Sequence, residues 1–366
     1  MSQVIIKARE TMTPKQRVRA TFNFEKTDRV TIGYETNGAV HMRLAKALGI
    51  PDGNYELVNR ALGVDYRGVG APYTGPQLFD VPPGRACNQL EGCYMRWIEH
   101  ETGGYWDFCD FPLQDADDEQ FYNYPVPNPD HFDYDAARDH AKACEYAVHV
   151  GSPGTPDIIN SNGRIMGMED ILCHLITGNE AAMHFIKKRA DSQLKVLERT
   201  LEKCGEFVDF MWLGEDLGTQ IAPMISLDLY RKQFKPIHKA FADLAAHYKI
   251  PVMVHTCGSS SWVYEDFIEM GIRGVDTLQP EAVNMSPQYL KDHFGGRLTF
   301  RGCISTAGPL AYGTPEETEQ NCIETLDIMM PTRGYHFAPT HAIQDNTPTE
   351  NIIKMYNTAH GYGGGR

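Results

Sequence analysis

The chain has 366 residues, of which 42% are hydrophobic and 22% are charged, and its formal net charge is −14. This length allows two ordinary domains or one large barrel with additions, and the composition is that of a globular protein with a large core. An acidic balance without a Lys/Arg cluster argues against nucleic acid and anionic membranes as partners. No run of 18 apolar residues is present, so no transmembrane helix is expected.

The cysteine content and the start of the chain bear on the compartment. The nine cysteines are an odd number, scattered without a disulfide framework, in a chain far larger than disulfide-stapled modules. Residues 1–20 lack the apolar core of a signal peptide. We therefore expect reduced thiols and a cytoplasmic protein.

The first part of the chain, residues 1–150, is irregular, acidic and rich in aromatic residues. One helix is expected over 37–49 and another near 133–150. Between them lie segments such as Tyr105–Phe108 and Phe121–Tyr124, among many Gly and Pro. We expect this part to supply the first barrel elements and loops that cover a substrate, and 151–366 to supply the main part of the same barrel.

From about residue 156, short β-rich runs alternate with helical patterns, as in the βα units of a parallel sheet. Six such units, with one or two from the first part, match a (β/α)8 TIM barrel with an irregular, aromatic-rich N-terminal elaboration. A doubly wound open sheet is the alternative, although no Gly-Xaa-Gly-Xaa-Xaa-Gly follows a strand. The expected strands are 157–160, 207–213, 252–255, 274–278, 298–301 and 335–338. The expected helices are 180–204, 228–248, 261–270, 287–294, 315–330 and 348–360.

Two helix starts carry capping signals. Thr314-Pro315-Glu316-Glu317 offers an N-cap threonine, proline at the first helical position and glutamate in the first turn. Residues 347–350, Thr-Pro-Thr-Glu, repeat the pattern. Both are expected to begin helices.

A short apolar run, 252–254, leads directly into His255-Thr256-Cys257 and is ended by Gly258. In a strand, residues two apart point to the same face, so the His255 imidazole and the Cys257 thiol are expected to project together. This pair suits zinc above other ions. The alternative is a core histidine beside a buried free cysteine.

Polar residues also follow the other expected strands. Glu215 and Asp216 follow the run at 207–213, Cys303 follows Arg301, and His341 follows the last run. In a barrel these ends share one rim, so they predict a site with three or four ligands. Each has a structural alternative: either carboxylate caps the next helix, Cys303 fills the core, and His341 bonds a loop backbone.

With these motifs in place, residues 12–362 resemble the uroporphyrinogen decarboxylase superfamily, and within it the cobalamin-dependent methyltransferase branch. The resemblance rests on motifs in the same order, and it implies a (β/α)8 barrel. The motifs are Met12–Arg17 with Asp28–Val30, Gly214–Gln220, His255–Gly258, Gly313–Glu317 and Ala338–His341.

The sequence departs from the superfamily at two places. The decarboxylases carry an arginine-rich motif where residues 33–38 here contain no arginine, so the carboxylates of a porphyrinogen would lack partners. The methyltransferases bind zinc through a His-Xaa-Cys and a distant Cys, and here the distant position is His341. A histidine is a competent zinc ligand, and Cys303 is an alternative source of a second thiolate.

The resemblance implies a zinc-dependent methyltransferase that works with a separate corrinoid-binding protein, because the chain lacks the cobalamin-binding Asp-Xaa-His-Xaa-Xaa-Gly. We favour transfer of a methyl group from a small methoxylated, aromatic donor to the corrinoid, which is the O-demethylase direction. Glu215 or Asp216 would either complete the metal coordination or handle the proton of the leaving phenolate. Methylation of a thiol, a metal-free lyase in which Asp216 and His341 do the acid-base work, and a non-catalytic tetrapyrrole-binding barrel are alternatives. Barrels of this kind often pair as homodimers.

Overall fold

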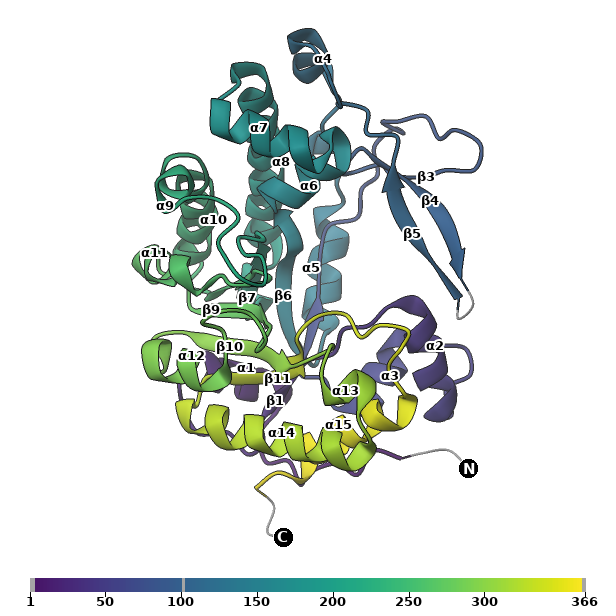
Figure 1. The fold of residues 1–366 in the computed structure, drawn as a ribbon, viewed down its shortest axis with the longest axis vertical. Coiled ribbons are helices and arrows are strands. Elements are labelled where there is room, and N and C mark those ends of the chain that lie inside the picture. The colour runs from purple at the N-terminus through teal and green to yellow at the C-terminus, as the bar shows by residue number, and fades with distance from the viewer. Residues whose placement is uncertain (1–3, 101–102, 364–366) are drawn as a thin grey trace.

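The computed structural model describes residues 4–100 and 103–363. Its main feature is a sheet of eight parallel strands in the order β1-β11-β10-β9-β8-β7-β6-β2, which follows the chain around a ring (Figure 1). This is the strand order of a (β/α)8 barrel. The strands are β1 (Thr31–Ile32), β2 (Tyr66–Gly68), β6 (Ala147–Pro156), β7 (Phe210–Gly214), β8 (Val252–His255), β9 (Gly274–Leu278), β10 (Thr299–Ile304) and β11 (Tyr335–Pro339).

The ring closes between β1 and β2 through one residue, Asp65. Its backbone N–H donates to the carbonyl of Ile32 (3.0 Å), and its carboxylate accepts from the Ile32 N–H (2.8 Å). The same carboxylate binds the buried guanidinium groups of Arg17 and Arg29. A side chain therefore takes the place of a strand ladder at this seam.

Helices surround the sheet, and the longest, α8, packs against α5 and β6 (Figure 1). The α-helices are α1 (Pro14–Phe22), α2 (Gly38–Ala47), α3 (Tyr55–Leu62), α4 (Asp118–Asn123), α5 (Tyr134–Ala143), α6 (Ile158–Met166), α7 (Met168–Thr177), α8 (Glu180–Cys204), α9 (Leu227–Leu229), α10 (Lys235–His247), α11 (Tyr264–Glu269), α12 (Pro287–Phe294), α13 (Pro309–Tyr312), α14 (Pro315–Met329) and α15 (Thr349–Gly361). Short turns are η1 (Pro129–His131), η2 (Gly205–Phe207), the π-helical η3 (Tyr230–Phe234), η4 (Ser261–Val263) and η5 (Met330–Thr332).

A second, three-stranded antiparallel sheet stands beside the barrel. It consists of β3 (Ala86–Asn88), β4 (Cys93–His100) and β5 (Gly103–Cys109). In Figure 1 it projects away from the barrel and points its β4–β5 end toward α2. Trp97 and Trp106 face each other across β4 and β5, with ring centroids 5.5 Å apart.

Apolar side chains fill both the barrel wall and one end of its interior. Val18 and Phe22 of α1 pack with Phe210, Trp212 and Met253 inside the ring. Helix α1 thus covers the end at which the strands begin. No helix in residues 4–100 and 103–363 is long and apolar enough to cross a membrane.

Most of the expected elements after residue 156 are confirmed. The strands at 252–255 and 274–278 and the helices at 180–204 and 287–294 have the predicted bounds. The expected strand at 157–160 is wrong, because β6 ends at Pro156 and α6 begins at Ile158. The helix expected near 133–150 ends at Ala143, because residues from Ala147 onward form β6.

The two capping patterns have different outcomes. Thr314 caps α14 as predicted, with its side chain accepting from the Glu317 N–H (3.2 Å) and the Glu317 carboxylate accepting from the Thr314 N–H (2.7 Å). Thr347 does not cap α15, whose N-cap is Pro348. The Thr347 hydroxyl is instead buried without a hydrogen-bond partner among the described residues, because its backbone belongs to a turn bonded to Gln344.

Candidate metal centre

His255 is the last residue of β8, and its ring is fixed by the neighbouring strand. Asp276 of β9 lies opposite His255 in the sheet register. The Asp276 carboxylate accepts a hydrogen bond from His255 Nδ1 at 3.0 Å, which leaves Nε2 directed to the other side. A carboxylate behind the imidazole is the usual support of a metal-binding histidine.

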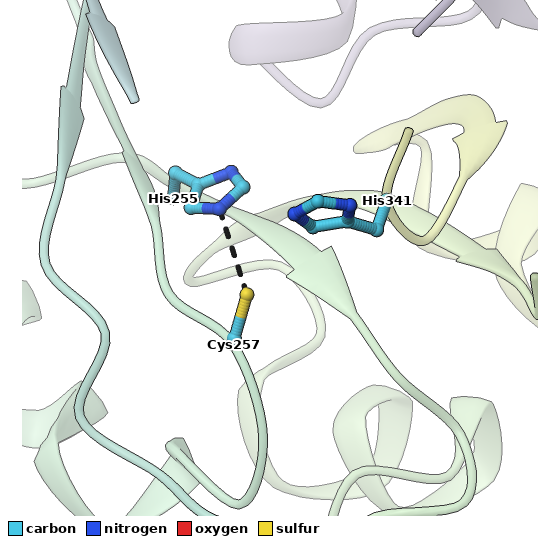
Figure 2. Close-up of side chains that lie close together, drawn as sticks. All are labelled: His255, Cys257 and His341. Atoms are coloured by element: carbon cyan, nitrogen blue, oxygen red, sulfur yellow. Dashed lines mark hydrogen bonds between the residues drawn. The ribbon is translucent and has the colours of Figure 1, made fainter. Parts of the chain in front are cut away.

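Three predicted ligands converge at this point: His255, Cys257 and His341 (Figure 2). Each offers one ligand atom, and these atoms all lie within 4.8 Å of one another. His255 Nε2 is 3.6 Å from Cys257 Sγ. Two such ligands on one tetrahedral zinc ion stand about 3.6 Å apart, given the usual Zn–N and Zn–S distances. The donor set and its spacing therefore fit zinc.

The loop that carries Cys257 depends on glycine. Gly258 has φ +70°, and a Cβ there would lie 2.2 Å from the carbonyl oxygen of Gly218. The Gly258 N–H donates to the Gln279 side chain (2.7 Å). Only glycine allows this turn and this close approach of two backbones, so Gly258 sets the direction in which the chain leaves the thiol.

Negative charge surrounds the Cys257 thiol. Burial, followed by the nearby Asp216 carboxylate, raises the pKa of Cys257. Burial alone would lower the pKa of His255, but the hydrogen bond and charge of Asp276 outweigh it and raise that pKa. Carboxylates around a thiol and two imidazoles are the surroundings in which a divalent cation is electrostatically favoured, and such a cation would ionise the thiol.

Arg301 of β10 stands behind this arrangement, inside the barrel. Its guanidinium is fully buried and donates to Asp276 (2.5 Å) and to the Tyr66 hydroxyl (2.7 Å). Burial would raise the pKa of Asp276, but the charge of Arg301, with smaller contributions from His255, lowers it. Arg301 thus keeps Asp276 ionised, and Asp276 orients His255.

The two predicted carboxylates, Glu215 and Asp216, have different surroundings. Glu215 is fully buried and accepts the N–H groups of Ile158 (2.8 Å) and Ile159 (3.0 Å) at the start of α6. It therefore caps a helix, but the preceding one rather than the next. Asp216 lies beside the ligand group, accepting from the Cys257 N–H (2.7 Å) and from the Asn160 amide (2.7 Å), with one oxygen 3.9 Å from His255 Nε2.

Cys303 does not join the group formed by the other three ligands among the described residues. Its side chain is buried in the hydrophobic core that also contains Tyr264 and Tyr335. Gly302 and Cys303 both have positive φ, 115° and 66°, so the end of β10 departs from the regular alternation that the prediction assumed. Burial raises the pKa of the Cys303 thiol. The structural alternative, a cysteine that fills core space, describes its position.

A cleft of about 1020 Å³ borders the loop that follows His341. One wall is the β4–β5 hairpin, and the other is the start of α2 with residues 344–346. His100 and Asp345 approach within 3.6 Å across it. The aromatic side chains of this wall are Trp97, Tyr105 and Trp106, and each is about half exposed.

Sequence reasoning missed Asp276, the role of Arg301, and Asn160. Asp276 and Arg301 interrupt otherwise apolar strands, and a charged residue inside a buried strand is the signal that marks a paired or functional group. Asn160 carried no such signal, because the sequence pattern predicts a strand over residues 157–160.

The comparisons with known proteins agree with this architecture. The family model of uroporphyrinogen decarboxylase (URO-D) matches residues 150–362. A solved structure, a methyltransferase from Methanosarcina mazei, is similar with a TM-score of 0.65 and 16% sequence identity, covering 95% of this chain and 98% of that chain. No curated protein sequence matches. The family match covers more than half of the 366 residues, and the chain belongs to the uroporphyrinogen decarboxylase family.

Proposed function

We propose that this protein is a zinc-dependent methyltransferase that moves a methyl group from a methoxylated aromatic compound to a corrinoid held by a separate protein. The observation that carries the proposal is the group of His255, Cys257 and His341. In this group His255 is buried, Cys257 is partly buried and His341 is exposed. Three protein ligands that leave one position open are typical of catalytic zinc rather than structural zinc.

Different residues of this chain would have different roles in the proposed reaction. His255, Cys257 and His341 would hold the ion, and Asp276 would fix the His255 ring. Bound zinc supplies a Lewis acid to the ether oxygen of the donor. Two neutral imidazoles and one thiolate carry less negative charge than two thiolates and one imidazole, so this ligand set favours an electrophilic metal.

Two further features support an aromatic ether as the donor. Trp97, Tyr105 and Trp106 line the cleft that residues 344–346 also border, close after His341 in the chain, and aromatic side chains can stack on a substrate ring. Asp216 is the predicted carboxylate that faces the ligand group, and its position suits it to deliver a proton to the leaving phenolate. The role of the aromatic N-terminal part as a substrate cover belongs to this proposal, and so does the homodimer.

Two alternative functions would use the same group of residues. If the protein instead methylates a thiol, the zinc would bind the thiol that accepts the methyl group rather than the methyl donor. A metal-free lyase, suggested by the family, needs cations for a polycarboxylate substrate. The loop at 33–38 has none, and the Arg301 guanidinium beside it is engaged by Asp276, Tyr66 and Glu35. The lyase alternative therefore has less support.

The decisive experiment measures zinc by plasma mass spectrometry in untagged protein. We expect about one zinc per chain, lost in Cys257→Ala with His341→Ala. The matched control, Cys173→Ala with His184→Ala, replaces two exposed residues outside the group and should keep the metal.

The same samples are then assayed for release of the demethylated phenol from methoxyphenols in the presence of reduced cobalamin. Turnover that tracks zinc content supports the proposal. Full turnover in the variant with both Cys257→Ala and His341→Ala would overturn the zinc mechanism, and no turnover in the zinc-containing wild type would leave the metal-free lyase in front.

A further inference from the structure

Arg189 of α8 is a buried cation that forms no salt bridge in the part of the chain that the structure describes, although the charge of the nearby Glu91 carboxylate acts on it. Its side chain is among the buried charged groups, at 7% exposure. It donates to the Ser161 carbonyl (3.0 Å), the Asn162 amide oxygen (2.6 Å) and the Glu91 carbonyl (3.2 Å), all of which are neutral. No carboxylate among the described residues forms an ion pair with it.

The nearest acidic side chain is already engaged. The Glu91 carboxylate pairs with Arg164 at 3.2 Å, while only the Glu91 backbone contacts Arg189. Burial lowers the pKa of Arg189, which reflects the cost of keeping this charge away from water. The Nε hydrogen and one Nη2 hydrogen of Arg189 have no acceptor among the described residues.

Arg189 lines a cavity of about 520 Å³ between α8 and the upper part of β6. This volume lies in the range of small-molecule sites. Most of the wall is apolar: Val69, Leu90, Val126, Phe132 and Val196.

Several polar residues also line the cavity, among them His149, Gln193 and Glu91, whose carboxylate pairs with Arg164. His149 Nδ1 is buried and lacks a hydrogen-bond partner among the described residues. Gln193 also lines the cavity, one helical turn from Arg189. The cavity therefore presents a cation, apolar walls and separate polar side chains.

We propose that this cavity binds a small monocarboxylate with an apolar body. The carboxylate takes the unused donors of Arg189, for which a planar two-oxygen anion has the matching shape. The apolar body packs on the apolar side chains named above, and a hydroxyl or carbonyl substituent reaches Gln193. The cavity shares no lining residue with the group of His255, Cys257 and His341, so this site does not depend on the proposed methyl transfer.

The test is calorimetric titration of the full-length protein with benzoate, and with benzyl alcohol as the neutral probe of similar size. We expect benzoate to bind one site per chain at least about tenfold more tightly than benzyl alcohol. Arg189→Gln should remove this preference. Arg199→Gln, which removes an exposed cation from the same helix, should leave it unchanged.

Because Arg189→Gln also removes three internal hydrogen bonds, a second variant keeps the test independent of folding. Val196→Phe fills the cavity and leaves Arg189 in place, and it should weaken benzoate binding at least about tenfold. Equal affinity for the two probes, or unchanged benzoate binding in Val196→Phe, would overturn the proposal. Loss of benzoate binding in Cys257→Ala would also overturn it, because the anion would then occupy the metal group.

Discussion

At the scale of single residues, His341 would set the charge of the proposed metal group. A cysteine at this position would supply a second thiolate, keeping three ligands while adding negative charge. We expect His341→Cys to retain zinc but to release phenol from a methyl ether at least about tenfold more slowly, because the metal becomes a weaker Lewis acid. Zinc content and the rate at saturating donor are measured together. An unchanged rate with zinc retained would contradict the argument from ligand charge.

Asp157 gives a pH prediction. Burial, followed by the charge of Glu215, raises the pKa of Asp157 to about 8 in the folded protein. An unfolded aspartate titrates near 4, so the folded state alone holds the proton between these values and stability falls as pH rises from about 4 to about 8. An asparagine at position 157 can still cap the N-terminus of α6, and it tolerates the φ of +45° found there.

We expect the free energy of unfolding of the wild type to decrease between pH 5 and pH 8, and Asp157→Asn to reduce that decrease by roughly 1–3 kcal/mol. Urea denaturation at four pH values in this interval provides the measurement. Asp133→Asn, a change at the exposed N-cap of α5, serves as the control and should leave the slope unaltered. Parallel curves for wild type and Asp157→Asn would refute the prediction.

Residue patterns predicted part of the candidate site and missed its support. His255 and Cys257 could be predicted because they stand together at the end of one strand. His341 could be predicted because it follows another strand at the same rim. Asp276 could not be predicted, because its role follows from its place opposite His255 on the next strand, and the register of two strands is a tertiary property. The place of Cys303 was also not predictable, because two consecutive positive φ values at Gly302 and Cys303 change the direction of the chain at the end of β10.

At the scale of elements, the two capping patterns form a natural pair for comparison. Thr314 bonds the backbone of α14, whereas the Thr347 hydroxyl is buried without a partner. We expect Thr314→Ala to lower the free energy of unfolding by about 1 kcal/mol and Thr347→Ala to lower it by less than about 0.5 kcal/mol. Thermal denaturation of both variants measures this difference. Equal losses would show that capping is not what distinguishes the two positions.

The element boundaries that sequence reasoning missed cluster around β6. This strand contains Gly151, Pro153, Gly154 and Pro156, which weaken any local β pattern. It becomes a strand because it pairs with β2 on one side and β7 on the other. The strands β8 and β9, by contrast, are short, mostly apolar segments that are buried along their whole length, as expected of a parallel strand inside a barrel, and their bounds were predicted correctly.

At the scale of the whole molecule, the barrel depends on the Asp65 seam. Replacing this carboxylate by an amide removes the fully buried anion shared by Arg17 and Arg29, which keep only the more exposed Glu10 and, for Arg17, Asp28. We expect Asp65→Asn to lower the free energy of unfolding by about 3–5 kcal/mol. Urea denaturation measures the loss, and Asp52→Asn, an exposed change, should be nearly neutral. A loss below about 1 kcal/mol would show that the strands close the ring without the ion pairs.

The pairing of β1 with β11 has a consequence for synthesis. Thr31 and Ile32 find their parallel neighbours in His336 and Phe337, which are made only after every other strand of the barrel. Until then, a nascent chain holds β1 with a free edge, although Asp65 can already join it to β2. The ring therefore closes only when β11 has left the ribosome, and chains truncated before residue 335 remain open sheets with two unpaired edges.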